Sequence, residues 1–255
     1  MSESLILIKQ LRPGVVELVL NRPERRNALT IALMGEFVAA VERLSAEGES
    51  RVLILRGAGP VFCAGLDLME ASAPALAEAG AQAVGRVLQS LVATPLITIA
   101  VAQGVAAAGG AGLLAACDFA VGSEGLKIVF PEVRRGLIPA LVATVLRKKL
   151  KDADLRDLFL LAEPIDAVRA RSMGLLSRVV AEGMERAEAD LLVDLILLGG
   201  PQAIRNTKAL LADLSAASES EAVRIALDYH IQAKVNPEAR EGLAAFLEKR
   251  QPNWA

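Results

Sequence analysis

The chain has 255 residues, of which 53% are apolar and 23% charged, and this composition excludes an intrinsically disordered protein. The net charge of −2 excludes a nucleic-acid-binding protein that needs a broad basic face, and the single histidine, His230, excludes a metal centre built from several histidines. Cys63 and Cys117 lie in apolar runs, which is typical of reduced thiols in an intracellular protein. The N-terminus lacks the basic stretch of a signal peptide, so we expect a cytoplasmic protein.

The first half of the chain alternates predicted strands with predicted helices. Residues 15–20 are typical of a strand that pairs with residues 5–8, and Thr30 is a suitable N-cap for a helix with apolar positions at helical spacing. The further predicted elements are strands at 52–55, 97–101, 119–121 and 127–130 and helices at 71–93 and 109–116. This alternation predicts an α/β core with mostly parallel strands that are covered on both faces.

The second half of the chain is mainly helical. From residue 140 onward the pattern favours helices, apart from a short strand at 177–180, and a Gly-Gly-Pro turn at 199–201 divides the last helices. We therefore predict two regions, an α/β core over residues 1–183 and a helical region over residues 184–255.

The uncharged segment 96–116 allows two other interpretations. It is long enough to span a bilayer, but its β-branched start, the turn at Gly104 and its small-residue end favour a buried strand and a buried helix. Gly110 and Gly112 match a dinucleotide-binding pattern, but such a pattern starts directly after its strand, and here the strand ends near Ala102. We expect close helix packing at this place, with no membrane span and no dinucleotide.

Two loops after predicted strands carry candidate binding groups. Arg22, Arg25 and Arg26 lie close together, which suits either a phosphate-binding loop or a solvated charged turn. The small residues before Gly65 in the segment 62–68 allow a turn whose backbone N–H groups point outward, and the alternative is an ordinary turn.

Glu132 is the candidate acid or base. It follows Pro131 within an apolar stretch, and an apolar setting raises the pKa of a carboxyl group toward the range in which it shuttles protons. The alternative is a surface glutamate that pairs with Arg134 or Arg135. The apolar residues 137–141 that follow suit an acyl-chain neighbour, but we interpret them as part of the core.

In chain order, these segments resemble the motifs of the crotonase family, also called the enoyl-CoA hydratase/isomerase family. The matching segments are residues 21–29, 62–68, 103–110, 117–118, 130–139 and 240–250. The resemblance implies an α/β fold built as a crotonase-like spiral of ββα units, with C-terminal helices that assemble a homotrimer or a hexamer. It also implies an acyl-CoA thioester as substrate, with CoA as part of that substrate and with no separate cofactor or metal.

The resemblance further implies roles for individual residues. The N–H groups of Leu66 and Gly109 match the family's oxyanion hole, and a helix that starts at Gly109 favours negative charge there. The positions that match CoA contacts are Arg25, Arg26, Ala28, Ala64, Leu68, Phe246 and Lys249. Met69 stands where many hydratases of the family have a lysine near the CoA phosphates.

Hydratases of the family usually carry two catalytic glutamates, and this chain matches one at Glu132 but has Gly112 at the other position. A single carboxylate is enough to move a proton between C2 and C4 of an enoyl thioester, as in the family's Δ3,Δ2-enoyl-CoA isomerases. We therefore expect isomerase-like chemistry. Three alternatives remain: a hydratase that uses Asp67 or Glu70, an acyl-CoA decarboxylase, and a non-catalytic acyl-CoA-binding homologue.

Overall fold

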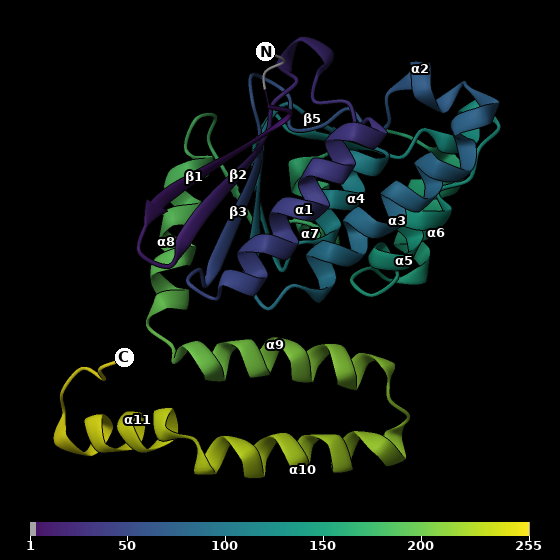
Figure 1. Ribbon diagram of the computed structural model, residues 1–255. Coiled ribbons are helices and arrows are strands. Elements are labelled where there is room, and N and C mark those ends of the chain that lie inside the picture. The colour runs from purple at the N-terminus through teal and green to yellow at the C-terminus, as the bar shows by residue number, and fades with distance from the viewer. Residues whose placement is uncertain (1–3, 255) are drawn as a thin grey trace. The chain divides into compact units, whose positions relative to one another are not determined.

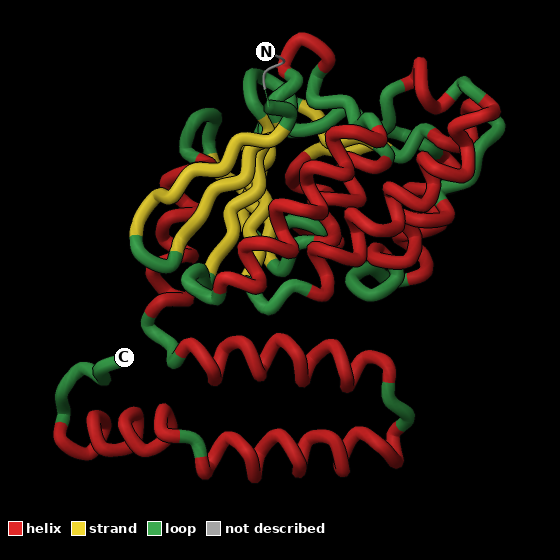
Figure 2. Tube along the Cα trace, in the orientation of Figure 1, coloured by secondary structure: helices red, strands yellow, loops and turns green. Residues whose placement is uncertain are grey.

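The computed structural model describes residues 4–254, which form two compact units. The first unit ends at Leu191, and the second starts at Leu192, so the division falls within helix α8 (Glu185–Leu197). The boundary expected from the sequence lies just before this helix. The first unit combines sheets and helices, whereas the described part of the second unit consists of helices and loops (Figure 2).

A six-stranded sheet forms the centre of the first unit (Figure 1). Its strand order is β1-β2-β3-β4-β6-β9, in which β1 pairs antiparallel with β2 and every other neighbouring pair is parallel. The strands are β1 (Ile6–Arg12), β2 (Val15–Leu20), β3 (Val52–Gly57), β4 (Ile97–Ala102), β6 (Phe119–Ser123) and β9 (Arg178–Val180). The expected α/β fold with mostly parallel strands is therefore confirmed.

A second, small sheet holds the segments that matter for the site. Strand β5 (Val105–Ala107) pairs parallel with β7 (Lys127–Val129), and β7 pairs antiparallel with β8 (Ile165–Asp166). Strands β5 and β8 were not predicted, because the two alanines of β5 have a low strand propensity and β8 has only two residues. The segment 96–116 contains the expected strand, β4, and the expected helix, α4, with the unpredicted β5 between them. No helix among residues 4–254 is long and apolar enough to cross a membrane.

Helices cover the large sheet on both sides. In Figure 1, α1, α3 and α4 lie on one side of the sheet, and α8 starts on the other side. The helices of the first unit are α1 (Ile31–Glu47), α2 (Leu68–Ala71), α3 (Ala77–Ala93), α4 (Gly109–Ala116), α5 (Ala140–Leu146), α6 (Asp152–Arg156), α7 (Ala167–Met173) and the start of α8. Thr30 caps α1 as predicted, because its hydroxyl accepts the Leu33 N–H at 3.1 Å.

The single helix predicted over residues 71–93 is wrong in its first turns. Helix α2 ends at Ala71, a short 3₁₀ turn follows at Pro74–Leu76, and α3 begins at Ala77. Pro74 explains the break, since proline lacks an N–H donor and disfavours helical backbone in the residue before it.

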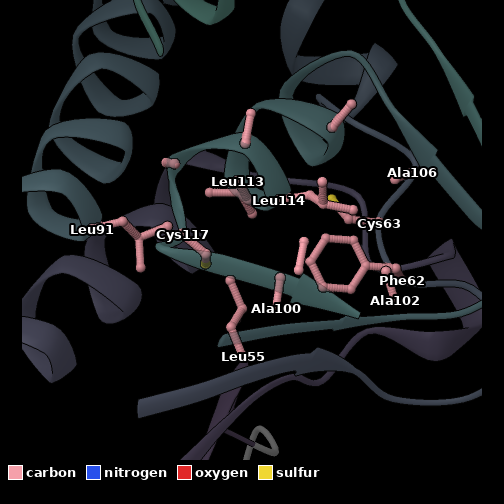
Figure 3. Packing of buried hydrophobic residues seen from close by; sticks show 14 of the residues in the cluster. Leu55, Phe62, Cys63, Leu91, Ala100, Ala102, Ala106, Leu113, Leu114 and Cys117 are labelled. Atoms are coloured by element: carbon pink, nitrogen blue, oxygen red, sulfur yellow. The ribbon is translucent and has the colours of Figure 1, made fainter. Parts of the chain in front are cut away.

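Helix α4 is buried along its whole length, and small residues allow this. A Cβ atom on Gly110 would overlap the carbonyl oxygen of Cys63, so the helix and this loop approach too closely for any side chain there. Figure 3 shows Leu113 and Leu114 of α4 among the other core residues above the sheet. The interpretation of the glycines as packing residues therefore fits the structure. Cys63 and Cys117 are both buried thiols.

The second unit contains three long helices after the end of α8. They are α9 (Pro201–Ala216), α10 (Glu219–Val235) and α11 (Pro237–Glu248). The carboxylate of Glu238 accepts the N–H groups of Gln202 and Ala203 at the start of α9, and the Trp254 indole donates to the Leu198 carbonyl at 2.9 Å. A pocket of about 610 Å³, lined mainly by apolar atoms, remains between these helices.

Candidate functional site

Three neighbouring extended segments end at one edge of the small sheet. Cys63 pairs with Ala106 in a parallel bridge, and Ala106 pairs with Ile128 in the parallel β5–β7 ladder. Leu66, Gly109 and Glu132 each lie a few residues beyond this row, in the same chain direction. Parallel segments in register carry the residues that follow them to the same edge of a sheet. Leu66, Gly109 and Glu132, the three residues predicted to be catalytic, therefore lie beyond the same edge of the small sheet.

The backbone around Leu66 leaves its N–H group unused. The segment pairs with residue Leu29 in a parallel bridge, in which Leu29 donates to the Gly65 carbonyl at 2.8 Å and accepts the Asp67 N–H at 2.9 Å. In this geometry the N–H of Leu66 itself points away from Leu29. Within residues 4–254 it donates to no acceptor.

Gly65 allows two loops to approach each other closely. Its φ of +88° lies in the left-handed region, and a Cβ atom here would come within 2.8 Å of the Ala107 carbonyl oxygen and 3.0 Å of the Ala108 Cβ. Only glycine fits without movement of the backbone. The turn before Leu66 and the segment before Gly109 are thus in contact.

The start of helix α4 supplies a second unused N–H group. Gly109 is the first residue of this helix, and within the described chain its N–H donates to no acceptor. Ala108 precedes it with φ 47° and ψ −118°, a strained backbone for a residue with a Cβ, and donates its N–H to the Val129 carbonyl. The positive end of the helix dipole adds to the attraction for an anionic oxygen at Gly109.

Glu132 is half-buried, and its Oε2 atom is fully buried without a hydrogen-bond partner among residues 4–254. Burial raises the pKa of Glu132, although a hydrogen bond from its own backbone N–H and the charge of Arg135 oppose this rise. Arg134, the other candidate partner, donates instead to the Leu161 carbonyl at 3.0 Å. A surface glutamate held in an ion pair does not fit these observations.

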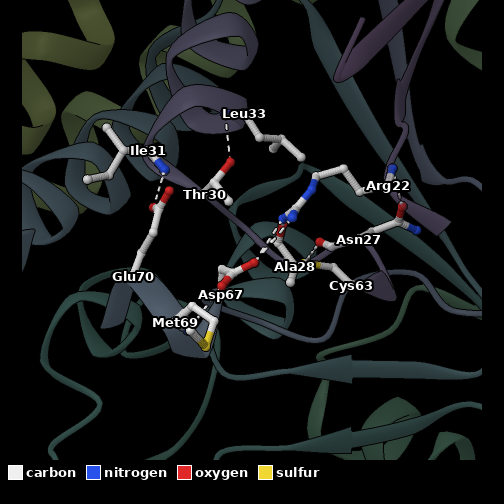
Figure 4. Close-up of polar contacts among 10 residues, drawn as sticks. All are labelled: Arg22, Asn27, Ala28, Thr30, Ile31, Leu33, Cys63, Asp67, Met69 and Glu70. Carbon is white, nitrogen blue, oxygen red and sulfur yellow. Dashed lines mark hydrogen bonds and ion pairs between the residues drawn. The ribbon is translucent and has the colours of Figure 1, made fainter. Parts of the chain in front are cut away.

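The two other carboxylates considered for catalysis are both held in place by hydrogen bonds (Figure 4). Asp67 binds Arg22 through Oδ2 and accepts the Met69 N–H through Oδ1, and Glu70 accepts the Ile31 N–H at 2.8 Å. Burial alone would raise the pKa of Asp67, but the hydrogen bonds from Met69 and Arg22 and the Arg22 charge lower it below its usual range.

The position expected for a second hydratase acid is filled by apolar side chains. A Cβ atom on Gly112 would come within 2.6 Å of Val142 Cγ1 and 3.3 Å of Leu88 Cδ2. Both neighbours are buried. This place therefore has neither a carboxylate nor space for one in the observed packing.

The predicted CoA-contacting residues of the first unit lie within a few residues of the Leu29–Leu66 bridge, and Leu68 is the first residue of helix α2. Arg25 and Arg26 are exposed, and neither forms an ion pair within residues 4–254, while Ala28 and Ala64 are half-buried and Leu68 is exposed. Phe246 and Lys249, which lie at the end of α11 in the second unit, are exposed as well.

The interpretation of residues 137–141 as part of the core is wrong for the first residues of the segment. Leu137 and Ile138 are exposed, because they lie in the connection between the 3₁₀ turn at Glu132–Arg135 and helix α5. Two apolar side chains are thus presented to solvent shortly after Glu132.

The sequence did not reveal how the loop at residues 22–28 is held together. Asn27 has a φ of 55° and is fully buried, and its side-chain amide donates to three carbonyls, those of Ala58, Val61 and Phe62. The Cys63 thiol donates to the Asn27 carbonyl at 3.2 Å, and burial raises the pKa of this thiol to about 12, which makes it a poor nucleophile.

Comparisons with known proteins agree with this architecture. The family described as enoyl-CoA hydratase/isomerase matches residues 10–255. The enoyl-CoA hydratase EchA19 of Mycobacterium tuberculosis is 33% identical over 243 residues, which cover 92% of this chain and 91% of that protein. The human mitochondrial enoyl-CoA hydratase domain-containing protein 2 is 32% identical over 251 residues, with coverages of 94% and 85%.

A solved structure gives the same result for the fold. The enoyl-CoA hydratase of Mycobacterium smegmatis superimposes with a TM-score of 0.95 at 29% sequence identity, and the match covers 99% of both chains. Both the sequence and the fold, over nearly their full lengths, place this chain in the enoyl-CoA hydratase/isomerase, or crotonase, family.

Proposed function

We propose that the chain is an acyl-CoA-processing enzyme that stabilises a thioester enolate and moves a proton with Glu132 alone. The buried, unpartnered Oε2 atom of Glu132 is the observation that carries this proposal. Burial raises the pKa of Glu132, and a carboxylate with a raised pKa accepts a proton more readily than an ordinary one.

In this proposal the N–H groups of Leu66 and Gly109 bind the thioester oxygen. Neither group has an acceptor within residues 4–254, so neither has to break a hydrogen bond to receive the substrate. Each such donor contributes about 2.7–4 kcal/mol to the stability of the anionic oxygen in the transition state.

The proposed reaction is the isomerisation of a 3-enoyl thioester to a 2-enoyl thioester. Glu132 removes a proton from C2, and the electron pair moves into the conjugated dienolate whose oxygen lies on the two N–H groups. Glu132 then returns the proton to C4, and the double bond moves from C3–C4 to C2–C3. This sequence needs one carboxylate and no cofactor beyond the CoA of the substrate.

Hydration is the second candidate, because relatives of the chain carry the name enoyl-CoA hydratase. It requires a second carboxylate to activate water, whereas Gly112 provides none and Asp67 and Glu70 are held by other groups. These contacts favour isomerisation. Decarboxylation and simple acyl-CoA binding are weaker alternatives, since neither requires a buried base.

We also propose which residues bind CoA, how the chains assemble and where in the cell the enzyme is located. Arg25 and Arg26 provide positive charge for the CoA phosphates, and Ala28, Ala64 and Leu68 line the CoA. Phe246 and Lys249 match positions that in the family contact CoA, often that of a neighbouring subunit. A homotrimer or hexamer in the cytoplasm is the expected form, although the human relative is named as mitochondrial.

An acyl-CoA panel in heavy water tests the reaction type. The protein is incubated with 3-enoyl, 2-enoyl and carboxyacyl thioesters, and mass spectrometry follows the products. We expect a shift of the double bond with deuterium incorporation at C2 or C4. Rapid addition of one water to the 2-enoyl thioester would support hydration instead, and loss of carbon dioxide would support decarboxylation.

A further inference from the structure

Arg22 is the arginine of its loop that does not face solvent. Its Nη1 atom donates to the Ala28 carbonyl at 2.7 Å and to Asp67 Oδ2 at 3.2 Å, and its Nη2 atom donates to the same carboxylate oxygen at 3.2 Å (Figure 4). The side chains of Arg22 and Asp67 are only 16% and 15% exposed. This guanidinium is therefore engaged by protein groups, unlike those of Arg25 and Arg26.

The two groups that Arg22 binds belong to the two segments of the Leu29–Leu66 bridge. Ala28 directly precedes Leu29, and Asp67 directly follows Leu66. Asp67 is fixed on its other side as well, since its Oδ1 atom accepts the Met69 N–H at 3.0 Å. Arg22 thus joins both segments at the place where the bridge ends.

The direction of the Leu66 N–H depends on this bridge. The peptide group between Gly65 and Leu66 is held by its carbonyl oxygen, which accepts the Leu29 N–H, and the next peptide group is held by its N–H, which donates to the Leu29 carbonyl. Any shift between the two segments would turn the N–H of Leu66 away from its present direction.

We propose that Arg22 is a positioning residue, which holds the Leu66 N–H in the direction that an anionic thioester oxygen requires. This inference rests on the proposed function of Leu66. In this proposal Arg22 aligns the oxyanion donor and does not bind the CoA phosphates, which are left to Arg25 and Arg26.

The test measures enolate stabilisation separately from CoA binding. Acetoacetyl-CoA has an ionisable thioester enol, and its enolate absorbs in the near ultraviolet, so a pH titration of the bound ligand gives the midpoint of enolate formation. Calorimetry with CoA, which has no acyl oxygen, gives the binding of the carrier alone.

Three variants of the pair separate positioning from folding. Arg22→Met removes the donors, Asp67→Asn removes the charge but retains an oxygen for the Met69 N–H, and Arg22→Lys is the conservative variant. Arg43→Met, which removes an exposed ion pair with Glu47 on α1, is the matched control. Circular dichroism verifies that each variant is folded, and if Arg22→Met does not fold, Asp67→Asn supplies the same comparison.

We expect Arg22→Met and Asp67→Asn to weaken enolate stabilisation about tenfold or more, since complete loss of one donor costs about 10²–10³-fold. A tenfold loss raises the midpoint by about one pH unit. The dissociation constant of CoA should change less than about threefold, Arg22→Lys should fall between, and Arg43→Met should match the wild type.

Two results would overturn the proposal in distinguishable ways. If the wild type forms the enolate and the folded Arg22 and Asp67 variants form it with the same midpoint, Arg22 does not position the donor, although the proposed function stands. If the wild type binds acetoacetyl-CoA without forming the enolate, the proposed function fails and the role of Arg22 fails with it.

Discussion

At Glu132, burial and nearby positive charge act in opposite directions. Burial disfavours the ionised carboxylate and raises its pKa, while Arg135 and a backbone N–H favour ionisation, and the net effect is a rise. The Oε2 atom has no partner within residues 4–254 that would repay its desolvation. A group held in this way reduces stability, and such a cost at one carboxyl is typical of a functional position.

A pH-dependent change in stability follows from this raised pKa. Because folding favours the protonated form of Glu132, its ionisation destabilises the fold at neutral pH, and this penalty vanishes below the ordinary value of 4.5. Glu132→Gln should therefore raise the Tm at neutral pH, and the gain should shrink as the pH falls through the raised pKa. Thermal unfolding at both ends of this range checks the prediction.

The matched control is Glu49→Gln, at an exposed glutamate after helix α1. Because this glutamate is exposed, the Tm difference between Glu49→Gln and the wild type should be small at both ends of the pH range. A Glu132→Gln protein that is less stable than the wild type at neutral pH would show that the carboxylate is stabilised by the fold.

Among the elements, the turn at Gly65 and the start of α4 depend on each other. Gly65→Ala would place a Cβ atom 2.8 Å from the Ala107 carbonyl oxygen on a backbone with φ +88°. We expect a loss of about 1–3 kcal/mol in the free energy of unfolding. We also expect kcat to fall by about 10²–10³-fold if the Leu66 donor is displaced.

Helix α3 offers a control for this glycine. Within residues 4–254, no heavy atom outside Gly80's own stretch of helix backbone lies within 4 Å of the position where a Cβ would be added. Gly80→Ala should therefore stabilise the helix by about 1 kcal/mol and leave kcat unchanged. Denaturant unfolding and steady-state kinetics on both variants make the comparison. Equal kinetics for Gly65→Ala and the wild type would be incompatible with the oxyanion role of this turn.

Helices α4 and α5 define a second prediction at this scale. Gly112→Glu alone should destabilise the protein by about 1–3 kcal/mol, because the new side chain meets Val142 and Leu88 in a packed region. Gly112→Glu combined with Val142→Ala should recover part of this loss. Denaturant unfolding of the two variants and of Val142→Ala provides the test, and a single variant as stable as the wild type would contradict it.

The sequence predicted the elements better than it predicted the contacts between them. The Thr30 cap, the strands of the large sheet and the limits of α4 follow from local patterns, because neighbouring residues determine them. The Arg22–Asp67 pair joins residues 45 positions apart, and we propose that it holds the Leu66 N–H in place. No local pattern contains that information, so the candidate site residues come from the motif resemblance rather than from periodicity.

At the scale of the whole molecule, the helices of the second unit leave apolar side chains uncovered. Neither α9 nor α10 contains a buried residue in the single chain, and Leu211, Val223, Leu227 and Ile231 are more than half exposed. An apolar surface of this kind is typical of an interface between subunits.

We therefore expect an oligomer with a mass three or six times the 26.8 kDa of one chain. Light scattering at micromolar concentration measures this mass. Ile231→Glu should reduce it, because a charge on the apolar surface opposes association, whereas Gln232→Glu, an equal charge at the next exposed residue, should not. A monomer mass for the wild type would refute the prediction.

The central claim is that Glu132 alone moves the proton, and the exchange reaction in heavy water tests it most directly. Glu132→Gln retains the size of the side chain but removes the base, so deuterium exchange at C2 and isomerisation should both fall by about 10²–10⁴-fold while CoA binding persists. If the wild type instead hydrates crotonyl-CoA rapidly, and Glu132→Gln retains most of that rate, the claim is contradicted and Glu132 is a structural residue.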